Sequence, residues 1–114
     1  MDYIFRKRKL MTTVIVKYSY PEKLTRAEAM EKFKQASEMF KDMDGLSSKQ
    51  FTFDEEKQTC LSVYNWESLE KAKNLFSDDF IPMFKEKVGK IPTYEIYDCL
   101  LMVDNRAHDV ISYV

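Results

Sequence analysis

Two large aromatic side chains, Tyr64 and Trp66, are the residues of this 114-residue chain best suited to hold a flat organic molecule. They lie two positions apart in a run of β-branched and aromatic residues at 59–66, which predicts a strand. Alternate residues of a strand point to the same side, so the two rings share one face. Such a face can line a cavity for a flat ligand, and plain core packing is the alternative interpretation.

The remaining reactive side chains form no catalytic set. His108 is the single histidine, so neither a His-based metal triad nor a Cys-His nucleophile pair can be built within one chain. Gly45 and Gly89 are isolated and provide no phosphate-binding loop. Cys60 and Cys99 are expected to be reduced, buried and small rather than paired. We therefore expect no metal and no cofactor, and no residue can be assigned as catalytic.

Carboxylates occur at three places where proton transfer could be considered. The acidic run at 54–56 falls in a predicted turn and is expected to be solvated, and residues 78–79 are expected to cap a helix. Asp98 interrupts an otherwise apolar run, where a buried carboxylate would need a partner such as Lys17 or Arg26. A structural ion pair or an exposed strand end is the simpler alternative to a role in proton transfer.

The composition favours a single globular domain that stays in the cytoplasm. The chain is 45% hydrophobic and 32% charged, and no apolar run approaches the roughly 20 residues that cross a bilayer. Its 18 basic and 19 acidic side chains give a net charge of −1, with no general attraction to nucleic acid or anionic lipid. The basic run at 6–9 could contact either one, but a solvated tail is the favoured interpretation. We therefore expect no nucleic-acid and no membrane partner.

Local signals place the elements that must position the aromatic face. Thr25 and Glu28 form a capping-box pattern that begins a helix with Phe33 and Phe40 on its apolar side. Ser68 is the best cap for a second helical region, which is expected to break near residues 77–79 and to end at 89. Four strands are predicted, at residues 12–20, 46–54, 59–66 and 93–103. Residues 1–11 are expected to be a flexible N-terminal extension, 12–105 the domain, and 106–114 a tail to which we assign no role.

The order strand, helix, strand, strand, helix, strand predicts an α+β fold of the ferredoxin-like βαββαβ type. Four antiparallel strands would carry the helices on one face and leave the other face to water. The strands nevertheless offer apolar residues on both sides, as Val14 and Ile15 illustrate. Because an exposed apolar sheet generally marks an interface, we expect a two-fold homodimer with the sheets facing each other in an α+β barrel.

Three pieces of the chain carry a family resemblance: Gly45-Leu46, Val63-Tyr64-Asn65-Trp66 followed by Ser68 and Ala72, and Tyr94-Glu95-Ile96-Tyr97 with Val103-Asp104-Asn105. They resemble the YdhR-type mono-oxygenases of the dimeric α+β barrel superfamily, which also includes the antibiotic biosynthesis monooxygenases. The resemblance covers about residues 12–105, including the order of the elements.

The resemblance implies a homodimer with one pocket per subunit between the sheet and the helices. It also implies oxidation of a small aromatic or quinol compound without metal or flavin, the substrate itself supplying the electrons. Trp66 matches the aromatic residue that lines such pockets, and Tyr64 could orient a phenol. Tyr18, Phe40 and Phe84 are the further pocket candidates.

Two other interpretations are weighed against this one. The haem-degrading relatives hold iron through a histidine on the second helix, and residues 69–88 contain none, which disfavours that branch. The alternative function is a non-enzymatic dimeric module that binds a small hydrophobic ligand. The residues alone do not decide between chemistry and binding.

Overall fold

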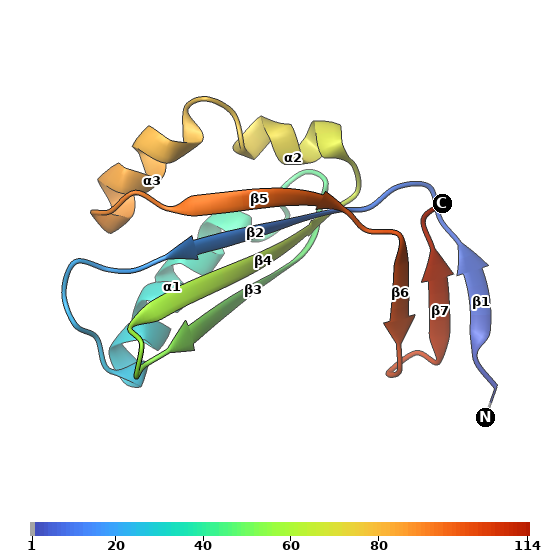
Figure 1. The fold of residues 1–114 in the computed structure, drawn as a ribbon, viewed down its shortest axis with the longest axis horizontal. Coiled ribbons are helices and arrows are strands. Elements are labelled where there is room, and N and C mark those ends of the chain that lie inside the picture. The colour runs from blue at the N-terminus through green and yellow to red at the C-terminus, as the bar shows by residue number, and fades with distance from the viewer. Residues whose placement is uncertain (1) are drawn as a thin grey trace.

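The computed structural model describes residues 2–114, which form three helices and two β-sheets (Figure 1). The strands and helices are, in chain order, β1 (Ile4–Lys7), β2 (Thr12–Tyr18), α1 (Arg26–Phe40), β3 (Leu46–Asp54), β4 (Thr59–Trp66), α2 (Leu69–Leu75), α3 (Phe80–Val88), β5 (Thr93–Asp98), β6 (Leu101–Asp104) and β7 (Asp109–Ser112).

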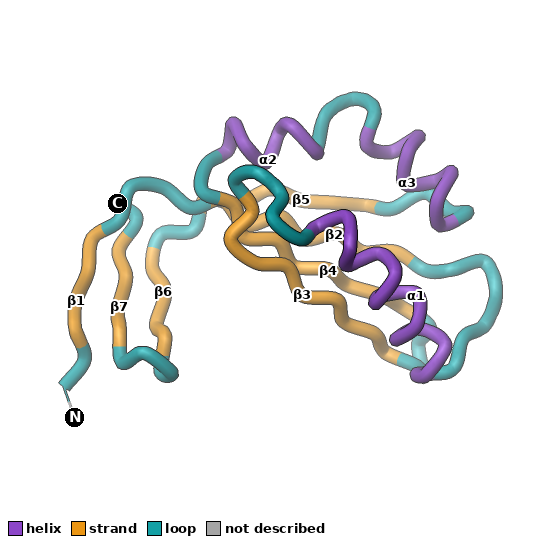
Figure 2. The backbone as a smooth tube through the Cα atoms, turned by 180° about the vertical axis from the view of Figure 1, so that it is seen from behind, coloured by secondary structure: helices purple, strands orange, loops and turns teal. Residues whose placement is uncertain are grey.

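The larger sheet has the strand order β3-β4-β2-β5, and every neighbouring pair is antiparallel. The three helices lie against one face of this sheet, and the other face carries no helix (Figures 1 and 2). This arrangement confirms the predicted ferredoxin-like α+β fold with four antiparallel strands.

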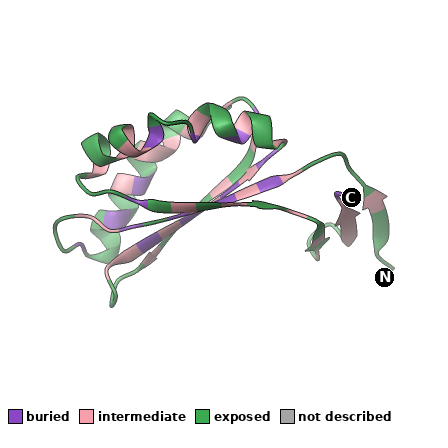
Figure 3. Ribbon diagram, turned by 45° about the horizontal axis from the view of Figure 1, so that its top comes forward, coloured by how far each residue is buried: buried purple, intermediate pink, exposed green. Residues whose placement is uncertain are grey.

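The predicted faces of β4 are confirmed by burial. Tyr64 and Trp66 are buried on the helix side, whereas Val63 and Asn65 point to the open side and are half-buried. The central strand β2 alternates in the same register, since Val14 lies opposite Tyr64. Figure 3 shows buried residues on these strands and on the helix sides turned toward them, with exposed residues outside. Burial of each large apolar side chain contributes roughly 1.5–3 kcal/mol, so this single interface holds the layers together.

The local helix signals act largely as predicted. The Thr25 hydroxyl accepts from the Glu28 N–H (3.1 Å) while the Glu28 carboxylate accepts from the Thr25 N–H (2.9 Å), which completes the capping box. The Ser68 hydroxyl accepts from the Lys71 N–H (3.1 Å) at the start of α2. Asp79 lies at the cap position of α3, but its side chain makes no capping hydrogen bond. The helical region therefore breaks where predicted, without the predicted side-chain cap.

The prediction of one long strand at 93–103 is wrong. The ladder between β5 and β2 ends at the pair Asp98 and Thr12, and the Cys99 N–H then donates to the Met11 carbonyl (2.9 Å). Because β2 has no earlier residues to pair with, the chain leaves the sheet after Asp98, and β6 begins at Leu101. Asp98 stands at this point in the sequence, but the apolar run resumes at Cys99, so the alternation of residues did not predict the break.

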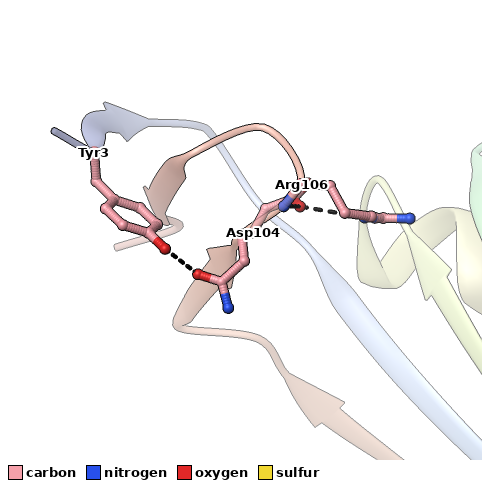
Figure 4. Close-up of polar contacts among 4 residues, drawn as sticks. Tyr3, Asp104 and Arg106 are labelled. Atoms are coloured by element: carbon pink, nitrogen blue, oxygen red, sulfur yellow. Dashed lines mark hydrogen bonds and ion pairs between the residues drawn. The ribbon is translucent and has the colours of Figure 1, made fainter. Parts of the chain in front are cut away.

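Residues at both ends of the chain form a second sheet, called the arm sheet here, with the order β1-β7-β6 (Figure 1). The strand β1 is parallel to β7, and β6 is antiparallel to it. Arg6 pairs with Asp109 at 3.1 Å. Figure 4 shows further polar contacts in which the Tyr3 hydroxyl donates to Asn105 and the Arg106 N–H donates to Asp104.

The sequence predicts a flexible extension at residues 1–11 and a tail without an assigned role at 106–114. Residues 4–7 and 109–112 are strands in the structure, and Met1 lies outside the described residues.

The arm sheet lies beyond the end of the larger sheet and leaves one side uncovered (Figures 1 and 2). Phe5 of β1 and Val103 of β6 both pair with Val110 of the central strand β7, so these three residues form one row across the sheet. Leu101 is two residues before Val103 on β6 and lies on the same side. The exposed fractions are 69% for Phe5, 59% for Val103 and 56% for Leu101. This side is therefore an apolar surface that no part of residues 2–114 covers.

No helix within residues 2–114 is both long enough and apolar enough to cross a membrane.

Gly45 provides a test of the connection between α1 and β3. Its φ of 80° lies in the left-handed region, and a Cβ there would lie 2.4 Å from the Lys71 Cβ. We expect Gly45→Ala to lower the free energy of unfolding by roughly 2 kcal/mol, because left-handed backbone strain and overpacking act together. Urea unfolding measures this change, with Ser47→Ala, at an exposed neighbouring position, as the control. Equal stability of the two variants would contradict the prediction.

Candidate binding pocket

A cavity of about 190 Å³ lies between the helix side of the larger sheet and the helices α1 and α3. An apolar cavity of about 150 Å³ is known to hold benzene, so this one matches a compound of one substituted ring or two small fused rings. Its walls are formed by aromatic, aliphatic and a few polar side chains: Tyr18, Tyr20, Gln35, Ala36, Met39, Phe40, Lys49, Phe51, Tyr64, Leu75, Phe80, Met83, Phe84, Lys87 and Val88.

The structure brings four of the five pocket candidates together on these walls. Tyr18 comes from β2, Phe40 from the end of α1, Tyr64 from β4 and Phe84 from α3. The rings of Tyr18 and Phe84 meet edge to face at 4.8 Å, and those of Phe40 and Tyr64 at 5.8 Å. Edge-to-face contacts of this kind fix ring orientation, so the walls are preformed.

Trp66, the fifth candidate, does not line the cavity. Its ring stacks on Tyr64 at a centroid distance of 6.2 Å, and only 1% of the residue is exposed. The Trp66 Nε1–H has no hydrogen-bond partner within residues 2–114. The structure therefore places Trp66 in the core behind the Tyr64 wall.

Sequence reasoning missed Lys49, which lies in the aromatic wall. It is opposite Tyr64 in the β3–β4 register, so its side chain enters the helix side of the sheet. The Lys49 Nζ lies over three rings, 3.5 Å from the centroid of Phe40, 4.0 Å from Phe51 and 4.5 Å from Tyr64. The signal was present in the sequence, because Lys49 shares the period-2 face of Phe51 and Phe53.

Burial changes the proton affinity of the groups in the cavity. Desolvation lowers the pKa of the Lys49 amine to about 7, because burial penalises the ammonium; the ring faces attract a cation and act in the opposite direction. Burial also raises the pKa of the Tyr18, Tyr20 and Tyr64 hydroxyls above their usual range. At neutral pH the tyrosines are therefore hydrogen-bond donors, while the Lys49 amine titrates.

The other acidic and nucleophilic candidates lie outside this cavity. The acidic run at 54–56 is exposed in the β3–β4 turn, as predicted, and the Asp54 carboxylate accepts from the Lys57 N–H (3.1 Å). Asp98 is an exposed strand end, which agrees with the simpler of the two interpretations. Cys60 is buried and Cys99 half-buried, and both are free thiols. Within the described part of the chain, no three His, Cys, Asp or Glu side chains gather as a metal site.

A larger groove of about 400 Å³ lies between α1 and the edge strand β3. It is lined in part by the exposed residues Arg26, Met30 and Glu55. The Glu55 carboxylate already accepts the Arg26 backbone N–H at 2.8 Å. Because exposed side chains border this groove, whereas aromatic rings from the sheet and the helices line the smaller cavity, the aromatic cavity is the candidate site.

Comparison with known proteins identifies solved structures of the same architecture. No protein-family model and no curated protein matches the chain. A monooxygenase encoded by ActVA-Orf6 of Streptomyces coelicolor, in complex with nanaomycin D, shares 13% identity over 79% of this chain and 88% of its own, with a TM-score of 0.60. SnoaB, a cofactor-independent oxygenase of Streptomyces nogalater, shares 14% identity over 86% of this chain and 98% of its own, with a TM-score of 0.53.

A candidate antibiotic biosynthesis monooxygenase of Caulobacter crescentus shares 19% identity over 81% of this chain and 92% of its own, with a TM-score of 0.58. The chain has the fold of the antibiotic biosynthesis monooxygenases. This confirms, at the level of fold, the resemblance predicted from the sequence.

The lowered pKa of Lys49 makes the free energy of unfolding depend on pH above about pH 7. An unfolded lysine keeps its proton to about pH 10.5, whereas folded Lys49 loses it above about pH 7, so the unfolded state binds more protons between these values. We therefore expect the free energy of unfolding to rise with pH from about 7 to about 9, by at most about 1.4 kcal/mol per pH unit.

Urea unfolding of the wild type and of Lys49→Met across this range measures the effect, and the variant should lack the rise. Lys87→Met is the matched control, because the Lys87 side chain is exposed at the rim. If the wild type and Lys49→Met have parallel pH profiles, the Lys49 amine does not titrate in this window.

Proposed function

We propose that the protein is a cofactor-independent monooxygenase-like enzyme that acts on a small aromatic or quinol compound in the sheet-helix cavity. The observation that carries the proposal is a preformed aromatic cavity of about 190 Å³ whose walls also present tyrosine hydroxyls. The fold supports it, because the structures that share it include an oxygenase described as cofactor-independent.

The cavity supplies what such a reaction requires of the protein. A flat substrate would lie between the rings of Phe40, Phe84 and Tyr64, and the Tyr64 hydroxyl would donate a hydrogen bond to a ring oxygen. The substrate would supply all four electrons that dioxygen accepts: in the keto tautomer of a phenol a ring CH₂ becomes C=O, and the second oxygen atom leaves as water. Exclusion of bulk water by the apolar walls would protect the electron-rich intermediate from side reactions.

Oxygen uptake with a panel of one- and two-ring phenols and hydroquinones tests this proposal. We expect Tyr64→Phe to lower the uptake rate roughly three- to tenfold through loss of one hydrogen bond. Trp66→Phe is expected to lower stability more than uptake, because Trp66 lies behind the wall. Tyr97→Phe is the control, because Tyr97 is exposed, at 48%, on the opposite face of the sheet. Uptake no faster than spontaneous oxidation for every compound would contradict the proposal.

The alternative is a non-enzymatic module that binds a small hydrophobic ligand in the same cavity. It is favoured by the absence, within residues 2–114, of a carboxylate or histidine on the cavity walls. A thermal-shift screen separates the two functions, because a ligand that stabilises the protein and is recovered unchanged after incubation in air has been bound without chemistry.

We also propose that the protein is a homodimer in which the open faces of the larger sheets meet. Ile15 and Val63 lie side by side at the centre of this face, with Leu61 next to them. The uncovered apolar side of the arm sheet adds a second surface that a partner chain could bury. Burial of both surfaces would remove apolar area that a monomer leaves in water.

Val63→Asp tests the dimer by sedimentation velocity. A carboxylate at the centre of the sheet-to-sheet contact would be buried without a partner, so we expect a shift from dimer to monomer with an unchanged circular dichroism spectrum. Lys34→Asp, on the exposed side of α1, is the control and should stay dimeric. A monomeric wild type, or a dimeric Val63→Asp variant, would show that this face is not the interface.

A further inference from the structure

We propose that the Lys49 amine takes the proton of a phenolic hydroxyl, so that the cavity selects small acidic phenols and holds them as phenolates. This inference rests on the proposed function, because it names the class of aromatic compound that the cavity accepts and assigns a residue to it.

The Lys49 amine lies among the rings that line the cavity. The Lys49 Nζ lies over the rings of Phe40, Phe51 and Tyr64, all three of which line the cavity. In the part of the chain that the structure describes, this Nζ has no ion-pair or hydrogen-bond partner. A desolvated amine among apolar rings lacks an oxygen partner, and a ligand oxygen in the cavity would supply one.

The cavity walls carry positive charge. Its walls include two lysines, Lys49 and Lys87, and no carboxylate among the described residues. Lys87 is exposed at the rim, where its Nζ lies 3.6 Å from the Met39 sulfur. The walls therefore complement an anionic oxygen, and Lys49, which is half-buried, is the less exposed of their two cations.

Lys49 is the group in the cavity that can accept a proton. The other titratable groups on the walls are the hydroxyls of Tyr64 on β4, of Tyr18 on β2 and of Tyr20 just after β2, together with Lys87 on α3. Burial keeps the three hydroxyls protonated by raising their pKa. Burial lowers the pKa of Lys49 to about 7, so its amine is partly unprotonated at neutral pH. Lys49 is therefore the proton acceptor inside the cavity.

The step conserves protons and charge. The O–H bond of the phenol breaks, its proton forms a new N–H bond on the neutral Lys49 amine, and the bonding electron pair stays on the phenolate oxygen. The ammonium and the phenolate then share a charge-assisted hydrogen bond, which is strong in a desolvated site. A phenolate is more electron-rich than a phenol, so the same step would prepare the substrate to reduce dioxygen.

The probe for this proposal is 4-nitrophenol, which absorbs visible light as the phenolate and not as the phenol. With wild-type protein at about one pH unit below the probe's own ionisation, we expect the phenolate band to grow on binding, equivalent to roughly a tenfold shift toward phenolate. Lys49→Met should bind the probe without the band, whereas Lys73→Met, at an exposed position of α2 outside the cavity, should behave as the wild type.

Proton uptake separates a proton acceptor from a mere positive charge. At about two pH units above the pKa of Lys49, 4-nitrophenol is already a phenolate in solution, so the wild type should take up about one proton per bound phenolate as the amine becomes an ammonium. Lys49→Arg carries a permanent charge that cannot accept a proton, so it should bind the phenolate with no proton uptake. Calorimetry in two buffers of different ionisation enthalpy measures this difference.

A methyl ether, 4-nitroanisole, separates failure of this inference from failure of the proposed function. The wild type should bind 4-nitroanisole roughly tenfold more weakly than 4-nitrophenol, and Lys49→Met should bind the two equally. If neither compound stabilises the wild type, the cavity does not hold small aromatic compounds and the proposed function falls. If both bind but the phenolate band is missing, or is equal in wild type and Lys49→Met, the Lys49 inference alone is overturned.

Discussion

The aromatic face of β4 is the surface on which the other layers of this domain are assembled. The Tyr64 ring meets Phe40 of α1 at 5.8 Å and Phe76, which follows α2, at 5.1 Å, both edge to face. Trp66 extends the same contact, stacking on Tyr64 and meeting Phe76 at 6.2 Å. The packing of α1 and α2 therefore depends on Tyr64 and Trp66, two successive inward positions of β4. Truncation of either ring would leave a cavity that the rigid sheet cannot close.

The cavity begins where this packing ends, and its chemistry follows from the mostly apolar side chains that line it. The same apolar side chains partly bury Lys49 and lower the pKa of its amine, because desolvation penalises the ammonium. An ionisable group in an apolar cleft is a frequent sign of a functional site. In this protein the burial of the aromatic rings also lowers the pKa of the Lys49 amine, so both features have one physical cause.

The arm sheet differs from the larger sheet in its strand pairing and in having no covering helix. Its central strand β7 takes β1 from the other end of the chain as a parallel neighbour. The apolar side with Phe5, Leu101 and Val103 is uncovered within residues 2–114. The larger sheet buries one face under helices, whereas the arm sheet has no helix over either side (Figure 2).

The sequence by itself determined what depends on residues close together in the chain. The Thr25-Glu28 capping box, the Ser68 cap and the two faces of β4 follow from spacings of two to four residues, and the element order led to the ferredoxin-like fold. Only the tertiary structure decided the contacts between distant segments. The end of β5 depends on where β2 begins, the strand β1 on a partner about a hundred residues away, and the reactivity of Lys49 on rings from other elements. A local pattern cannot show these features, because pairing register and desolvation arise only when the segments meet.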